Sequence, residues 1–114
     1  MALQVTIFSI NNYLKLKNLN LHDSELHNIR VDYLNKEIQV QFVTAVTPEV
    51  NSNQIFWVFK EVYDFNITMK EPWGSGFYVN SIEFDEFSDR HIKTIVLLNS
   101  GDEINCISEI IKLE

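Results

Sequence analysis

Hydrophobic and polar residues alternate along much of the chain after residue 25. In residues 26–33 the apolar set is Ile29, Val31 and Tyr33, and residues 38–42 repeat the alternation. A period of two places alternate side chains on opposite faces of a β-strand. The pattern therefore predicts an antiparallel hairpin that has one solvated face.

Residues 55–69 form a segment that is too long for a typical strand. Every position in residues 55–59 is apolar, which is typical of a strand covered on both faces, whereas residues 63–69 alternate. Lys60 and Glu61 separate the two patterns. We expect either two strands here or one strand with a bulge or bend.

Three more strands are predicted towards the end of the chain, over residues 77–87, 92–98 and 103–113. The last two flank a Ser-Gly-Asp run at residues 100–102, which favours a hairpin turn. Near the start, residues 3–10 alternate like a strand, and Ser9 is a candidate cap for a short helix over residues 10–16.

These elements predict a single, mainly all-β domain over residues 1–114. We expect an antiparallel sandwich or partly closed barrel of about seven or eight strands, with a short helix near the N-terminus. An α+β domain is the alternative.

The composition and charge of the chain argue against several classes of protein. The chain of 114 residues is 46% hydrophobic, which argues against disorder, and its net charge of −7 argues against direct nucleic-acid binding. Its single cysteine cannot form an internal disulfide, so we expect a cytoplasmic protein. Apolar runs fall far short of the roughly 20 residues that span a bilayer. A monomer or homodimer without cofactors is expected.

One short motif stands before the first predicted hairpin, His22-Asp23-Ser24 within Leu-His-Asp-Ser-Glu-Leu. Together with the hydrophobic run of residues 56–65 and the closing hairpin at residues 100–102, it resembles small bacterial β-rich domains. Some of these are immunity proteins of polymorphic-toxin systems. The resemblance implies that the motif marks a strand entry and implies no catalytic role for it.

The His22-Asp23 pair also invites comparison with metal-dependent phosphohydrolases. Those enzymes hold the pair on a helix and need further ligands from other helices, whereas this chain is rich in predicted strands. His22 and His27 lie on opposite faces of a strand, and Glu25 with His27 makes only half a metal site. We interpret Asp23 and Ser24 as a turn at the strand entry. A hydrolase using His22, Asp23 and Glu25 is the alternative.

Cys106 is a candidate nucleophile if His91, on a neighbouring predicted strand, lies beside it. Alternation places Cys106 between Ile104 and Ile110 on an inward face. There a lone cysteine is usually a small buried hydrophobe.

Four acidic residues gather near the predicted strand at residues 77–87, namely Glu83, Asp85, Glu86 and Asp89. In order of preference they form a solvated face, a surface for a basic partner, or a carboxylate pair that binds a cation or cleaves a glycoside. Trp73 stands in a glycine-flanked turn, either as an interface residue or as a cap on the sandwich.

These observations lead to the expectation of a non-enzymatic protein-interaction domain. We expect an immunity-type protein that neutralises a basic bacterial toxin through Trp73 and the acidic surface. The alternative is a small-ligand-binding β domain, whose pocket is lined by aromatic side chains. Its lining residues are Trp57, Tyr63, Trp73 and Tyr78.

Overall fold

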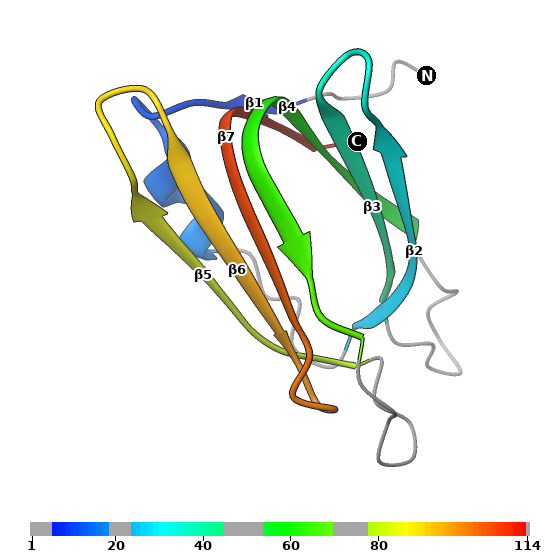
Figure 1. Ribbon diagram of the computed structural model, residues 1–114. Helices are drawn as coiled ribbons and strands as arrows, with labels where there is room; N and C mark the ends of the chain where they lie inside the picture. The colour runs from blue at the N-terminus through cyan, green and yellow to red at the C-terminus, as the bar shows by residue number, and fades with distance from the viewer. Residues whose placement is uncertain (1–5, 19–23, 45–53, 70–77, 114) are drawn as a thin grey trace, which may run out of the picture.

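The chain folds as an all-β protein in a computed structural model that describes residues 6–18, 24–44, 54–69 and 78–113 (Figure 1). The elements are β1 (Thr6–Phe8), a 3-10 helix η1 (Tyr13–Asn18), β2 (Glu25–Asp32), β3 (Glu37–Val43), β4 (Gln54–Ile67), β5 (Val79–Glu86), β6 (Ile92–Leu98) and β7 (Glu103–Leu113). Within these ranges the strands make one antiparallel sheet in the order β2-β3-β4-β7-β6-β5, and β1 pairs with the end of β7.

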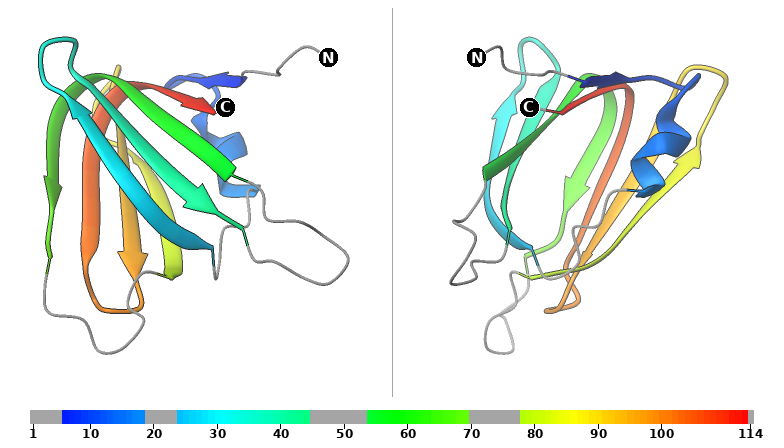
Figure 2. Two further views of the ribbon diagram at one scale, coloured as in Figure 1. Left: turned by 90° about the vertical axis from the view of Figure 1, so that its right-hand side faces the viewer. Right: turned by 180° about the vertical axis from the view of Figure 1, so that it is seen from behind.

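The sheet curves so strongly that its two halves face each other like the layers of a sandwich (Figure 2). The start of β4 pairs with β3, whereas β7 follows β4 on the other side along most of its length. The outer strands β2 and β5 meet at a single bridge, Glu25 with Tyr78, where the Val79 N–H donates to the Ser24 carbonyl at 2.8 Å. The sheet is therefore sandwich-like and is not closed into a barrel.

The interruption predicted at Lys60 and Glu61 is one long strand, with a left-handed residue at Glu61 and a β-bulge just beyond it. The register between β4 and β7 shifts between Val62 and Asp64, and Glu61 adopts a positive φ of 54°. The Val62 N–H leaves the ladder and donates to the Lys36 carbonyl at 3.0 Å. A bulge adds twist and bends its strand, so it turns β4 from one half of the sheet into the other.

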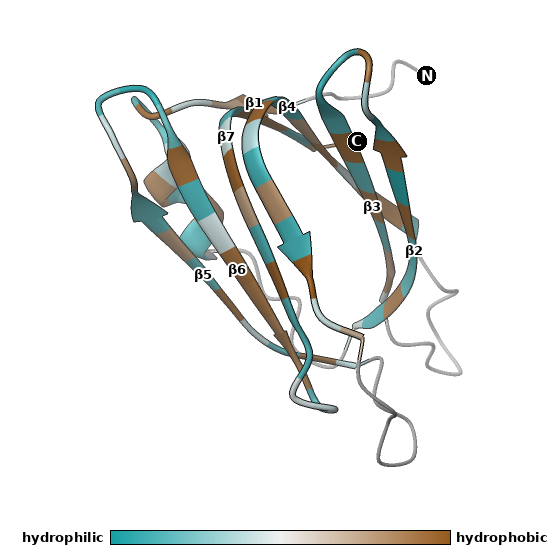
Figure 3. Cartoon of the chain, in the orientation of Figure 1, coloured by the Kyte–Doolittle hydropathy of each residue, from teal (hydrophilic) through white to brown (hydrophobic). Residues whose placement is uncertain are grey.

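Trp57 of β4 lies at the centre of the core, with 1% of its surface exposed. Its ring packs against Phe42, Phe59 and Phe84 at centroid distances of 5.5, 6.3 and 5.6 Å. Because Phe42 and Phe84 come from opposite halves of the sheet, Trp57 ties the halves together. Hydropathy alternates along the strands as this single interior requires (Figure 3).

The expectation that residues 55–59 are covered on both faces is wrong. Phe56 and Val58 are only half-buried, because the inner face of the sheet packs on the core while these side chains lie on the outer face. Similarly, the predicted apolar face of β2 is buried unevenly. Ile29 packs on the core, but Val31 and Tyr33 are 56% and 78% exposed.

The N-terminal region contains both of the predicted elements. β1 is followed by a turn in which the Ser9 N–H donates to Asn12 Oδ1 at 2.7 Å and the Asn12 N–H donates to the Ser9 carbonyl at 3.1 Å. This turn occupies the place of the expected first helical residues, so the helix begins at Tyr13 and is of the 3-10 type. Leu16 anchors it in the core.

The α+β alternative is wrong, because the described residues hold strands and this one short 3-10 helix. None of the described helical segments is long and apolar enough to cross a membrane.

Because the backbone at Glu61 is left-handed, glycine should destabilise the protein less than alanine at this position, the reverse of the order in a regular strand. The free energy of unfolding of Glu61→Gly should be about 1 kcal/mol higher than that of Glu61→Ala, because glycine tolerates positive φ and alanine does not. Urea unfolding followed by tryptophan fluorescence measures the difference. The same pair at Lys60, in the regular strand, should show the opposite order. Equal stabilities of the two Glu61 variants would contradict a left-handed backbone at this residue.

Candidate functional site

The acidic residues of β5 belong to a larger exposed face that spans four strands. Asp85 is opposite Lys93 of β6, Lys93 is opposite Ile107 of β7, and Ile107 is opposite Asp64 of β4. Ile107 lies outside the main core cluster, and Asp64 and Asp85 are exposed. At about 4.8 Å per strand, the two carboxylates stand roughly 14 Å apart on one surface.

A second row runs parallel to the first. Glu83 is opposite Ile95, and Ile95 is opposite Asn105, whose side-chain amide donates to Glu103 at 3.4 Å. Ile95 and Leu97 are half-buried between these polar side chains. We call the outward side of β5, β6, the start of β7 and the end of β4 the acidic face. Its carboxylates come from Asp64, Glu83, Asp85 and Glu103.

Glu83 and Asp85 were predicted from the sequence as part of an acidic surface, whereas Asp64 and Glu103 were not. The two missed residues come from other strands, and only the order of the strands brings them beside β5. Glu86 and Asp89 are exposed as well, at the end of β5 and in the turn that follows it. The acidic cluster in the sequence is thus one part of a surface that extends across several strands.

Basic residues gather on the outer face of the opposite half of the sheet. Arg30, Lys60 and Lys112 line a hollow of about 340 Å³ between β2, β3, β4 and β7. Asp32 and Glu37 share this hollow, and Glu37 pairs with Lys60 at 3.5 Å. Charge is therefore distributed unevenly between the two outer faces of the protein.

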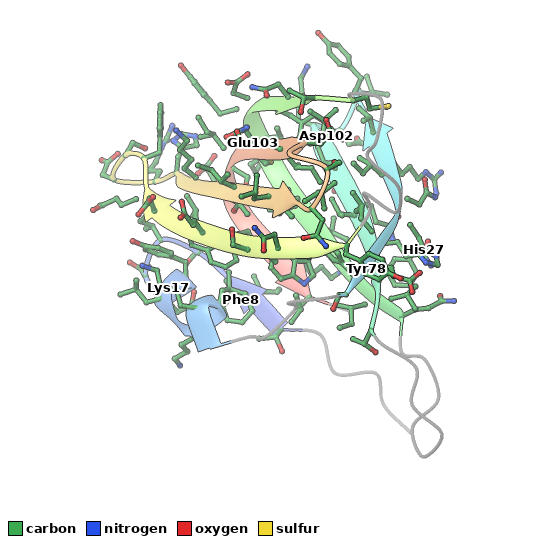
Figure 4. The ribbon with its side chains drawn as sticks, turned by 90° about the horizontal axis from the view of Figure 1, so that it is seen from below. Phe8, Lys17, His27, Tyr78, Asp102 and Glu103 are labelled. Carbon is green, nitrogen blue, oxygen red and sulfur yellow. The ribbon has the colours of Figure 1, made fainter. Side chains whose placement is uncertain are left out.

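Glu83 and Asp85 also line a shallow hollow of about 480 Å³ beside η1, together with Lys17. Figure 4 shows Lys17 on η1 next to β5. An ammonium group beside two carboxylates offsets their charge, whereas a cation site needs more oxygen ligands. In the described part of the chain, no group of three or more His, Cys, Asp or Glu side chains is arranged to hold a metal.

Only the end of the His-Asp-Ser motif can be placed. His22 and Asp23 lie outside the described residues, as does Trp73. Ser24 is buried, and its carbonyl accepts the hydrogen bond from Val79 that joins β2 to β5. This part of the motif therefore contributes to the junction between the two edge strands.

Glu25 and His27 share a strand face, as their spacing predicted. Glu25 Oε1 lies 2.9 Å from His27 Nε2, and both side chains are substantially exposed. Figure 4 shows His27 near Tyr78, at the edge where β2 approaches β5. The pair provides two polar groups on the surface, which is half of a metal site.

Cys106 is fully buried, which confirms the interpretation of it as a small core residue. Burial raises the pKa of its thiol to about 12, and the nearby Asp64 carboxylate raises it further while Ser108 opposes the shift. A protonated thiol is a poor nucleophile. His91 does not pair with it, because Cys106 lies opposite Thr94 and Phe65 in the sheet.

His91 instead contacts Ser88, a pairing that the sequence analysis did not consider. Ser88 Oγ lies 2.8 Å from His91 Nδ1. The same oxygen accepts the backbone N–H groups of Arg90 and His91 at 3.2 and 3.1 Å. These bonds close the β5–β6 turn, and we assign the pair a structural role.

Three of the four aromatic residues expected to line a ligand pocket lie in the described part of the chain, and these three are dispersed. Trp57 is enclosed in the core, whereas Tyr63 is 64% exposed and lies on the rings of Phe87 and His91 at 6.1 and 5.2 Å. Tyr78 lies at the start of β5 beside Glu25. A filled core around Trp57 counts against a ligand cavity there.

Comparison with known proteins bears on the fold alone. No family model matches the chain, and no curated protein matches it. Among solved structures, an uncharacterized protein from Neisseria gonorrhoeae is similar, with a TM-score of 0.60 and 13% sequence identity. The match covers 97% of each chain. The two chains therefore share an architecture over nearly their full lengths.

The raised pKa of Cys106 predicts a specific loss of stability in alkali. The unfolded thiol ionises above about pH 9, whereas the folded thiol stays neutral up to about pH 12. The stabilisation is present below pH 9 and is lost as the pH rises between these values. At pH 10.5 the wild type should have lost about 2 kcal/mol more than Cys106→Ala, relative to pH 8. Urea unfolding of both proteins measures this, and equal losses would contradict the assignment.

Proposed function

We propose that this protein is a non-enzymatic binding domain that captures a basic partner protein on its acidic face. The observation that carries the proposal is the convergence of Asp64, Glu83, Asp85 and Glu103 on one exposed surface. Ile95 and Leu97 lie between these carboxylates and offer apolar contact area. Such a combination of charge and partly exposed apolar side chains suits protein recognition.

The field of the protein supports a directed association. Glu83 and Asp85 are two residues apart on β5, about 7 Å, which is within the Debye length of about 8 Å at physiological salt, so their potentials add. The basic hollow lined by Arg30, Lys60 and Lys112 lies on the opposite half of the sheet. A basic partner is therefore attracted to one side of the molecule and oriented before contact.

The partner that we propose is a basic bacterial toxin, and the role is that of an immunity protein. The net charge of −7 and the resemblance around His22-Asp23-Ser24 support this choice. A toxin that acts on nucleic acid must present a basic surface to phosphates. An acidic face can occupy that surface and block the substrate.

Charge reversal on the acidic face tests the proposal. Glu83→Lys with Asp85→Lys changes the net charge from −7 to −3. Association with the basic protein encoded beside this gene should slow by tenfold or more, with a weaker dependence on salt. Stopped-flow kinetics at several salt concentrations measure the rate, and co-expression with the toxin measures protection of growth.

The matched control is Glu37→Lys with Glu61→Lys, which makes the same change in net charge away from the acidic face. This control should keep the association rate within about threefold of the wild type, because it alters the total charge and leaves the face intact. Equal effects of the two double variants would reject the acidic face. A neighbouring gene product that does not bind at all would reject the immunity role.

A further inference from the structure

A groove separates β2 from the second half of β4. At one end, β2 residues Val31 and Asp32 face β4 residues 62–65 across a hollow of about 330 Å³. At the other end, β2 residues 26–29 face Ile67 across a hollow of about 340 Å³. Both hollows lie between β2 and the second half of β4, and we call them together the groove. Figure 1 shows the end of β4 between β7 and the β2–β3 hairpin.

The two strands that border the groove present sheet edges. The described part of β2 pairs with β3 on one side, and its other side makes only the terminal bridge from Glu25 to Tyr78. Beyond the bulge, the described residues of β4 pair with β7 on the side away from the groove. An open strand edge carries backbone N–H and C=O groups that can pair with a further strand.

Exposed apolar side chains concentrate along this groove. Of the eight large hydrophobic residues that are exposed in the described ranges, four line it. These are Val31, Tyr33, Tyr63 and Met69. Apolar side chains that gather beside open strand edges mark an interaction site, whereas scattered ones carry no meaning.

The rim of the groove carries two carboxylates and one ammonium group, and it adjoins the acidic face. Asp32 and Asp64 line the same hollow, one from each strand. Asn35 lowers the pKa of Asp32 through hydrogen bonds, so this carboxylate stays charged. Lys36 lies 3.6 Å from the Tyr33 ring centroid. Asp64 also belongs to the acidic face, so one partner can reach both surfaces.

We propose that the groove binds an extended segment of a partner protein, in which apolar residues alternate with Lys or Arg. The segment adds as a strand beside β2 or β4, its apolar side chains entering the groove and its cations meeting Asp32 and Asp64. Backbone hydrogen bonds supply affinity in this mode, and alternate side chains supply specificity. Beyond Val62, whose N–H already donates to the Lys36 carbonyl, residues 63–67 span about 17 Å, which accommodates a strand of about five residues.

The test uses the full chain and two synthetic peptides with capped ends. One is Lys-Val-Lys-Val-Lys-Val-Lys, and the other carries proline in place of the central valine. Proline removes a backbone donor and keeps every charge. Isothermal titration at 0.15 M salt should show at least tenfold weaker binding of the proline peptide. Hydrogen exchange should show new protection in β2 or the end of β4 when the first peptide binds.

Two protein variants provide a matched comparison. Val31 and Ile7 are both 56% exposed, and Ile7 lies on β1, outside the residues that line the groove. Val31→Lys should weaken peptide binding at least tenfold, whereas Ile7→Lys should change it less than twofold. The double variant of Glu83 and Asp85 should keep peptide binding within threefold. The groove can therefore bind even if the acidic face proves to have no partner.

Four results would overturn the proposal. The first is no saturable binding, and the second is equal affinity for the two peptides, which would indicate attraction by charge alone. The third is that the protection from hydrogen exchange on peptide binding is confined to β5. The fourth is a dimer of the free protein, detected by sedimentation and abolished by Val31→Lys, which would assign the groove to a second copy of the chain.

Discussion

The pairing of β4 with β7 through the bulge between Val62 and Asp64 organises the whole molecule. The two strands run together through both halves of the sheet, so the bend in β4 sets how the halves face each other. Trp57 packs from β4 onto Phe42 and Phe84, which lie in opposite halves. Without the bend, these rings could not meet around one core.

The same bend creates the two surfaces proposed as binding sites. Once β4 has left β3 for the other half of the sheet, its second half contributes Asp64 to the acidic face. Its departure also separates it from the β2–β3 hairpin, and the groove lies in the opening. Both surfaces are consequences of a sheet that curves without closing, and Asp64 is common to both.

Four polar groups or side chains in the described part of the chain have structural roles. Cys106 is neutral and enclosed, Ser88 and His91 close a turn, and the Ser24 carbonyl joins β2 to β5. Each of these groups is buried in the core or forms hydrogen bonds with nearby residues. The exposed carboxylates and the apolar groove residues are what the fold leaves available to a partner.

The amino-acid sequence by itself determined the strands, the interruption at Lys60 and Glu61, and the burial of Cys106. These features depend on neighbours within a few residues, where the period of two and the turn residues act directly. Glu83 and Asp85 were found for the same reason. Only the tertiary structure decided that Asp64 and Glu103 join them and that Val31 stays exposed at a groove. Those outcomes depend on strand order and curvature, which alternation along one strand does not encode.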